Sequence, residues 1–186
     1  EICDMSNPFV LRGGRVIDPA NGVDDGRDVA VADGVFVAPE RVPGADIIDV
    51  SGLVVAPGFI DMHVHLRDPG QVEKEDLISG TRAAAAGGFT TVLAMANTKP
   101  PIDTAARLEE LLARARSHAA VHVLQAACLT VGGRGDMLVD GAALKYAGAM
   151  ALTDDGTCIQ DDATMAEALR MAHAIGLPVI EHCEDV

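Results

Sequence analysis

Basic residues are scarce in this sequence, and their scarcity excludes several kinds of partner. Its 186 residues include 14 lysines and arginines against 28 aspartates and glutamates, which gives a formal net charge of −14. Proteins bind nucleic acids and anionic membrane surfaces through basic patches, so we predict no nucleic acid and no membrane as a partner. An anionic small-molecule substrate would need a locally placed cation, for which Arg67 is the first candidate.

Long apolar runs, a secretory signal and paired cysteines are also missing. No apolar run approaches the roughly 18 residues that a membrane helix needs. The first residues lack the basic segment of a signal peptide, and the absent initiator methionine indicates a piece of a longer product. Scattered cysteines without CxxC spacing are typical of reduced thiols, so we expect a cytoplasmic protein. The four are Cys3, Cys128, Cys158 and Cys183.

The most informative stretch is residues 57–70, where His63 and His65 close an apolar run. Side chains at i and i+2 of a strand point to the same face, so both imidazoles can reach one point. Neutral imidazole suits zinc and neighbouring divalent metals. Two half-buried histidines in a core would show the same pattern. The polar pair Arg67-Asp68 follows at once and favours a catalytic rim.

The first part of the chain predicts a small β-sheet module over residues 1–56. Two hairpins are expected, at residues 9–19 and 28–37, because each contains glycine between two β-prone runs. Two further apolar runs occupy residues 47–50 and 53–55.

From residue 57 to 186 the pattern alternates between strand and helix, which indicates an α/β fold with a parallel sheet. The expected strands are 59–66, 89–95, 121–127, 149–152 and 178–182. The expected helices are 73–86, one capped by Asp103 or Thr104, 138–147, and one capped by Asp161 or Asp162. A complete TIM (β/α)8 barrel needs on the order of 250 residues. We therefore predict a partial barrel of about five strands, truncated after the fifth.

Polar residues gather where the predicted strands end. Five of them fall at or just after a carboxyl end: His63, His65, Asn97, Asp155 and His182. In βα barrels the chemistry lies at this face, so we expect these side chains to share one site. For Asp155 an ordinary turn role stays open, because Asp-Asp-Gly is also a good turn signal.

The stretch 57–70 resembles the signature of dihydroorotases, which belong to the amidohydrolase superfamily of metal-dependent hydrolases and cyclic amidases. The likeness continues in family order at residues 87–91, 97–98, 153–156 and 181–185. It implies reversible hydrolysis of the cyclic amide of dihydroorotate to N-carbamoyl-aspartate in pyrimidine biosynthesis. It also implies that C-terminal strands complete the β module.

The resemblance implies one or two zinc ions as cofactor. His63 and His65 would hold one ion, and Asp155 would bridge it to a second ion held by His182. Hydantoinases and allantoinases usually present a carboxylated lysine instead of this aspartate. The only nearby lysine, Lys145, lies about two helical turns too early for that role, which favours dihydroorotase.

The resemblance assigns Arg67 to the substrate carboxylate, which a planar guanidinium can bind through two hydrogen bonds, and Asn97 to the same task. Ala96 stands where family members usually have proline. The aspartate that serves as general acid and base is expected beyond Val186. No catalytic residue is therefore predicted within the chain, and we expect the 186-residue piece alone to be inactive.

Three alternatives stay open. An allantoinase-like or hydantoinase-like cyclic amidase would use a similar site. A non-catalytic dihydroorotase-like scaffold would assemble with aspartate transcarbamoylase, although such homologues typically lose the metal histidines that this chain keeps. The piece could also fail to fold by itself. The family likeness allows a homo-oligomer or a complex with aspartate transcarbamoylase as a partner assembly.

Overall fold

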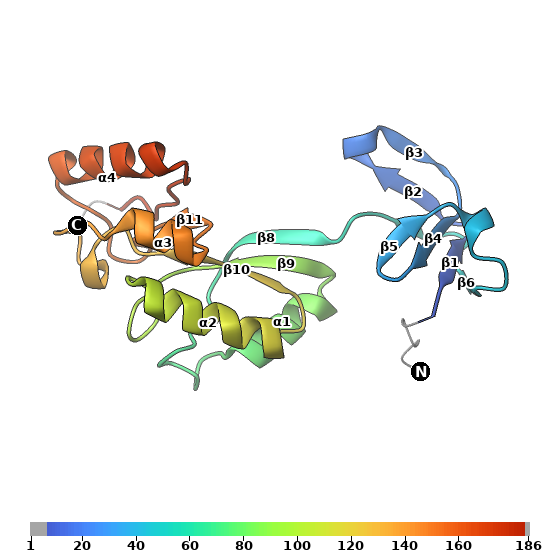
Figure 1. Ribbon diagram of the computed structural model, residues 1–186, viewed down its shortest axis with the longest axis horizontal. Helices are drawn as coiled ribbons and strands as arrows, with labels where there is room; N and C mark the ends of the chain where they lie inside the picture. Colours follow the sequence, from blue (N-terminus) through green and yellow to red (C-terminus); the bar gives the residue numbers. More distant parts are fainter. Residues whose placement is uncertain (1–6, 185–186) are drawn as a thin grey trace. The chain divides into compact units, whose positions relative to one another are not determined.

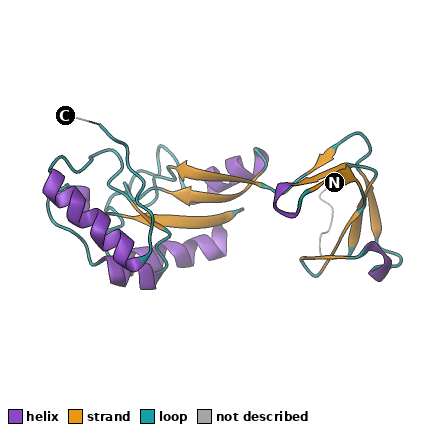
Figure 2. Cartoon of the chain, turned by 90° about the horizontal axis from the view of Figure 1, so that it is seen from above, coloured by secondary structure: helices purple, strands orange, loops and turns teal. Residues whose placement is uncertain are grey.

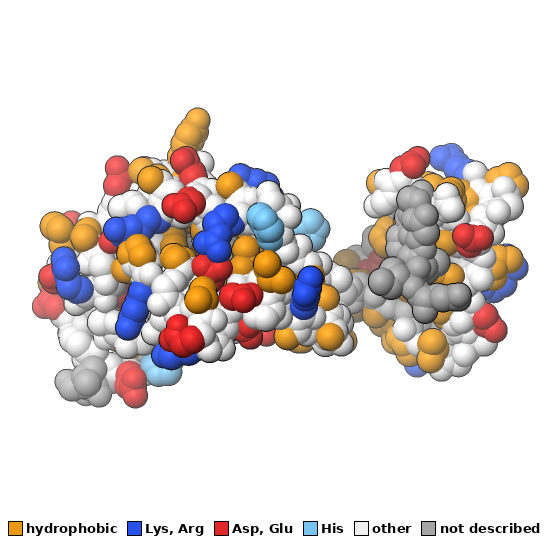
Figure 3. All heavy atoms as spheres, turned by 90° about the horizontal axis from the view of Figure 1, so that it is seen from below, with side chains coloured by type: hydrophobic (Ala, Val, Ile, Leu, Met, Phe, Trp, Pro, Cys, Tyr) orange, Lys and Arg blue, Asp and Glu red, His pale blue; other side chains and the backbone are white. Residues whose placement is uncertain are grey.

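The computed structural model describes residues 7–184, and the predictions for Cys3 and Asp185 lie outside them. The chain divides into two compact units, Glu1–Pro57 and Gly58–Val186, which are described separately below (Figure 1). Among the described residues, the helices are too short or too polar to cross a membrane. Acidic and basic side chains are interspersed over the surface drawn in Figure 3.

The first unit is built from short strands in two sheets, with the orders β5-β4-β1-β6 and β3-β2-β7. The strands are β1 (Phe9–Arg12), β2 (Arg15–Asp18), β3 (Val23–Gly26), β4 (Val29–Ala32), β5 (Val35–Val37), β6 (Asp46–Asp49) and β7 (Val54–Val55). Two 3-10 helices, Pro19–Asn21 and Pro39–Arg41, join them. Phe9, Val10, Val16 and Ala30 are its buried apolar residues.

Of the two predicted hairpins, one forms and the other does not. β4 and β5 pair antiparallel around Asp33 and Gly34, whose φ values of 52° and 74° suit a tight hairpin turn. The hairpin expected at residues 9–19 is wrong. β1 pairs with β4 and β6, whereas β2 pairs with β3 and β7. Gly13, at φ 83°, therefore turns the chain from one sheet into the other rather than back along β1.

The second unit contains a parallel sheet with the order β11-β10-β9-β8. Its strands are β8 (Phe59–Val64), β9 (Phe89–Ala94), β10 (His122–Ala127) and β11 (Ala151–Leu152). Helices follow each strand in the chain and flank the sheet (Figure 2). They are α1 (Leu77–Ala86), α2 (Ala105–His118), α3 (Gly141–Ala147) and α4 (Asp162–Ile175), with a 3-10 turn at Val131–Gly133.

Side-chain caps fix where α1, α3 and α4 begin, whereas Thr104, which precedes α2, makes no such bond. Asp76 accepts hydrogen bonds from the backbone N–H groups of Ile78 and Ser79, so α1 starts at Leu77. The predicted start at residue 73 is therefore wrong by four residues, because no cap precedes Glu73. Asp161 caps α4 as predicted.

The fifth predicted strand, 178–182, is reduced to a single bridge in the described residues. Leu152 pairs with Val179 there, through bonds of 2.9 Å from Leu152 N to Pro178 O and from Ile180 N to Leu152 O. The largest buried cluster packs α2, α3 and α4 against β10 and β11. Its members include Leu108, Leu111, Leu129, Leu144, Leu152 and Ala168. This packing fixes the carboxyl ends of the strands, where the polar residues lie.

Candidate metal centre

Three polar side chains meet at the carboxyl end of the parallel sheet. His63 lies near the end of β8, His65 directly follows that strand, and Asp155 follows β11. Their ligand atoms all lie within 4.8 Å of one another. The Nε2 atom of His63 is 3.6 Å from Asp155 Oδ1, and that of His65 is 3.5 Å from Asp155 Oδ2. The parallel strands therefore bring two distant segments to one point.

These separations fit a bound divalent cation. Two ligands at about 2.0–2.1 Å from a tetrahedral zinc ion are about 3.3 Å apart, close to the observed nitrogen–oxygen distances. Two imidazole nitrogens and a carboxylate also form a donor set that a borderline metal prefers. Burial lowers the pKa of His65, which favours the neutral imidazole that a metal needs, although its hydrogen bond with Asn97 opposes this shift.

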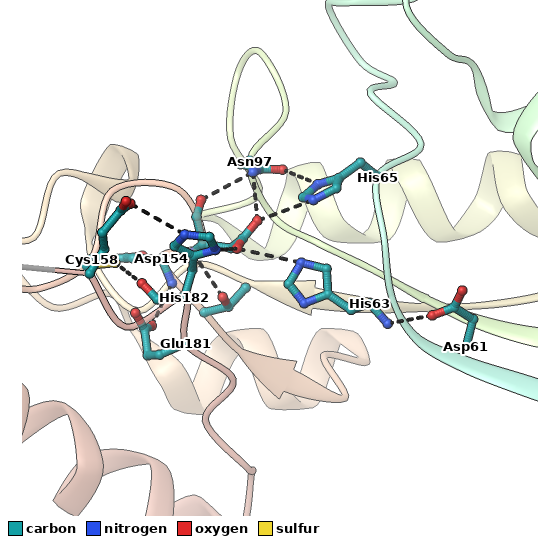
Figure 4. A network of polar contacts seen from close by, with 11 residues as sticks. Asp61, His63, His65, Asn97, Asp154, Cys158, Glu181 and His182 are labelled. Carbon is teal, nitrogen blue, oxygen red and sulfur yellow. Dashed lines mark hydrogen bonds and ion pairs between the residues drawn. The ribbon is translucent and has the colours of Figure 1, made fainter.

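Asn97, which follows β9, fixes the proton of His65. Its amide Nδ2 donates to Asp155 Oδ2 at 2.9 Å and to the Asp155 carbonyl at 3.2 Å, so its Oδ1 is the atom that faces His65. The distance from His65 Nδ1 to that oxygen is 3.0 Å. An amide oxygen only accepts, so Nδ1 carries the proton and Nε2 keeps its lone pair towards Asp155. Figure 4 shows the Asn97 amide pointing towards the His65 ring.

Asp154 is buried beside Asp155, but its carboxylate stabilises the fold through hydrogen bonds. Its Oδ1 accepts the backbone N–H groups of Leu129 at 2.9 Å and Thr130 at 3.1 Å, and its Oδ2 accepts the Thr130 hydroxyl. Burial raises the pKa of Asp154, which these hydrogen bonds partly offset. Its backbone N–H donates to Glu181 Oε1 at 3.0 Å. Sequence reasoning missed this anchoring role, because neighbouring aspartates look alike in a motif.

His182 lies at the margin of the site. Its Nδ1 is 3.9 Å from Asp155 Oδ1, while its Nε2 is 3.4 Å from Glu184 Oε2. The Cys158 thiol donates to the His182 carbonyl oxygen. The buried Oε2 of Glu181 has no hydrogen-bond partner among the described residues. His182 is therefore near Asp155 but outside the compact group formed by His63, His65 and Asp155.

Arg67 is half-buried and has a left-handed backbone, with φ 56°. Within residues 7–184 its guanidinium has no hydrogen bond or ion pair. Burial is the main cause of the lowered pKa of His65, and the positive charge of Arg67, two residues further along the chain, contributes to it. Its neighbour Asp68 is instead paired with Arg114, a contact that the sequence pattern did not reveal.

Two hollows lie at opposite ends of the strands. A pocket of about 290 Å³ adjoins the site and is lined by Asn97, Lys99, Asp155 and Thr157 among others. A larger hollow of about 720 Å³ lies at the amino ends of β9 and β10, away from the clustered polar residues. The smaller pocket is the one that chemistry favours, because Asp155 and Asn97 line it.

Comparisons with known proteins agree with this geometry. Residues 52–186 match the dihydro-orotase-like family. The dihydroorotase of Citrifermentans bemidjiense is 48% identical over 185 residues, which cover 96% of this chain and 43% of that protein. The dihydroorotase of Aquifex aeolicus is 44% identical over 180 residues, with 95% and 43% covered. The chain thus spans less than half the length of these relatives.

A solved structure shows the same architecture. The L-hydantoinase (dihydropyrimidinase) of Arthrobacter aurescens matches with a TM-score of 0.81 at 22% identity, over 96% of this chain and 41% of that one. Together with the parallel sheet, this likeness confirms the predicted α/β fold, a partial (β/α)8 barrel preceded by a β-sheet module.

Proposed function

Because the chain belongs to the dihydro-orotase-like family, we propose that it forms the first part of a dihydroorotase that hydrolyses a cyclic amide to N-carbamoyl-aspartate. The observation that carries this proposal is the arrangement of His63, His65 and Asp155 around one point. A zinc ion bound there would acidify water and polarise the amide carbonyl. The small-molecule substrate, a cytoplasmic location and assembly as a homo-oligomer or with aspartate transcarbamoylase belong to the same proposal.

The residues of this chain would divide the work between them. His63 and His65 present their Nε2 atoms to the metal, and Asn97 holds the tautomer of His65 that makes this possible. Asp155 would supply negative charge to the metal, and His182, whose Nδ1 is 3.9 Å from Asp155 Oδ1, would help to hold a second ion. We also propose that residues 1–56 and 57–186 are separate domains.

Arg67 would bind the carboxylate of dihydroorotate. A half-buried guanidinium without a protein partner is suited to an anionic ligand, because a carboxylate can accept two parallel hydrogen bonds from it. Its position beside His65 would place the substrate carboxylate near the metal. Asn97 is already bonded to both His65 and Asp155, so any contact it makes with substrate is secondary to positioning them.

A hydantoinase-like activity is the second candidate, and the likeness to the L-hydantoinase fold favours it. Lys145 argues against it. Its ammonium donates to the carbonyl oxygens of Ile175 and Gly176 at the end of α4, away from the metal group. This contact argues against a role as a carboxylated bridging ligand, whereas Asp155 lies in one group with His63 and His65.

The test compares two double variants. His63→Ala with His65→Ala should remove bound zinc, measured by elemental analysis after dialysis, both in this chain and in a family-length protein that carries it. Turnover of dihydroorotate by the latter should be abolished. The matched control is His122→Ala with His173→Ala, which replaces two exposed histidines outside the site. It should change neither the zinc content nor the turnover of dihydroorotate. Retained zinc in the first double variant would contradict the ligand assignment.

A further inference from the structure

The two residues that flank Arg67 are both anchored to one turn of α2. Leu66, 7% exposed, packs in a small cluster with Leu77, Ala94 and Ala115. On the other side, the carboxylate of Asp68 accepts a hydrogen bond of 2.5 Å from an Nη2 of Arg114.

The Asp68 side chain is almost wholly buried, and Arg114 is its ion-pair partner. The Asp68 side chain is 7% exposed, whereas the Arg114 side chain is 43% exposed. A buried carboxylate needs a compensating partner, because its desolvation is otherwise unfavourable. The Asp68 pairing raises the pKa of Arg114, in keeping with a strong contact. Loss of Arg114 would therefore leave the buried Asp68 carboxylate without its ion-pair partner and favour movement of the loop towards solvent.

The rest of this loop is held on its opposite side by Lys99. The backbone N–H of Lys99 donates to the Pro69 carbonyl at 2.9 Å. Gly70, at φ 96°, lies so close that a Cβ atom would stand 1.8 Å from the Lys99 carbonyl oxygen. Gln71 closes the turn by donating its N–H to the Arg67 carbonyl at 2.9 Å. The guanidinium of Arg67 is the charged group in this tight turn that has no partner in the described residues.

We propose that Arg114 is a positioning residue, whose contact with Asp68 holds loop 66–71 so that Arg67 is presented to an anionic substrate. This inference rests on the proposed function, since it assigns the loop to the binding of the substrate carboxylate. Arg114 itself lies on α2 and contacts Asp68 rather than substrate. Its effect is therefore on the orientation of Arg67, which a preorganised site needs within narrow limits.

The first measurement is independent of activity. Amide hydrogen exchange of Gln71 and Lys99 should become at least tenfold faster in Arg114→Met, because both N–H groups bond to carbonyls of the loop. Arg116→Met is the matched control, an exposed arginine on the same helix, and should leave both rates unchanged. Arg114→Lys keeps the charge and should restore part of the protection. Equal exchange in Arg114→Met and in the unmodified protein would overturn the proposal.

The second measurement is kinetic and uses a family-length protein that carries this chain. For dihydroorotate, Arg114→Met should raise KM at least tenfold while kcat changes less than threefold. Dihydrouracil has the same ring without the carboxylate. For this substrate the unmodified protein and Arg114→Met should have the same KM and kcat. An equal loss on both substrates, or a loss in kcat alone, would show that Arg114 supports the fold or the metal group instead.

A double variant distinguishes loss of the Asp68–Arg114 contact from general destabilisation of the protein. Asp68→Asn with Arg114→Met should perform no worse than Arg114→Met alone, because the two single changes break the same contact. Additive losses would contradict a shared role. If the unmodified protein hydrolyses neither substrate, the proposed function fails, whereas the exchange rates still decide whether Arg114 holds the loop.

Discussion

Two neighbouring carboxylates after β11 differ in how fully the protein satisfies them. Asp154 and Asp155 are both buried, 3% and 6% exposed. Asp154 accepts three hydrogen bonds from Leu129 and Thr130. The Asp155 carboxylate accepts one, from Asn97, and otherwise faces three imidazole nitrogens at 3.5, 3.6 and 3.9 Å that form no hydrogen bond with it.

This difference separates a carboxylate that the fold satisfies from one that it leaves largely without hydrogen bonds. A carboxylate has about four acceptor positions, and a buried charge is stable only when most of them are used. Asp154 meets this condition within the protein, whereas the Asp155 carboxylate accepts a single hydrogen bond from the described residues. The same contrast separates two arginines of the second unit. Arg114 is paired with Asp68, but Arg67 has no partner in the described residues.

The largest expected effect comes from Asp155→Asn. An amide cannot supply the negative charge that balances a divalent metal, so we expect zinc to be lost and turnover to fall at least a thousandfold in a family-length protein. The unfolding midpoint in urea should change little, because the hydrogen bond from Asn97 can be kept. Metal content by elemental analysis gives the direct check, and full zinc occupancy in Asp155→Asn would show that Asp155 is not a ligand.

Asp154→Ala tests the carboxylate whose hydrogen bonds are satisfied within the protein. It leaves the buried N–H groups of Leu129 and Thr130 without an acceptor, so we expect a loss of about 3 kcal/mol in the free energy of unfolding. Asp154→Asn keeps one carbonyl acceptor and should cost about half as much. Urea unfolding measures both values. A loss below about 1 kcal/mol in Asp154→Ala would mean that water replaces the carboxylate.

The sequence was sufficient to predict the alternation of strands and helices and the polar strand ends. Apolar periodicity marks a buried face, and glycine and capping residues mark its limits, as at Asp161 and Gly176 of α4. The hairpin at residues 9–19 failed because glycine permits a tight turn but does not decide which strand pairs with which. The tertiary packing of the two small sheets decided it.

The candidate site was predictable where strand geometry alone brings residues together, as for His63 and His65. The pairings of Arg114 with Asp68 and of Asp154 with Thr130 were not, because they join residues 46 and 24 positions apart on elements that meet only in the fold. Local pattern carries no information about such contacts. The distinction between Asp154 and Asp155 likewise depends on which backbone N–H groups lie nearby.

Arg67→Lys tests the arginine that has no ion-pair partner in the described residues, in contrast to Arg114. Lysine keeps the positive charge but loses the planar pair of donors, so kcat/KM for dihydroorotate should fall by about 2 kcal/mol, or roughly thirtyfold. Stability should be unchanged, since no protein contact is lost. Dihydrouracil serves as the control substrate. If both substrates lose equally, Arg67 supports the loop or the metal group and does not bind a carboxylate.

The smallest effect is expected from Lys145→Met, which removes a satisfied cation far from the metal group. Lys145 donates to the carbonyl oxygens of Ile175 and Gly176, the end of α4, where a positive charge and a hydrogen bond both stabilise a helix. We expect a loss of about 0.5–1 kcal/mol in the free energy of unfolding, with zinc content and turnover unchanged. A carboxylated bridging lysine would behave differently. In that case Lys145→Met would lose zinc, and the activity of the unmodified protein would depend on added bicarbonate. That outcome would favour the hydantoinase-like alternative and would remove the bridging role from Asp155.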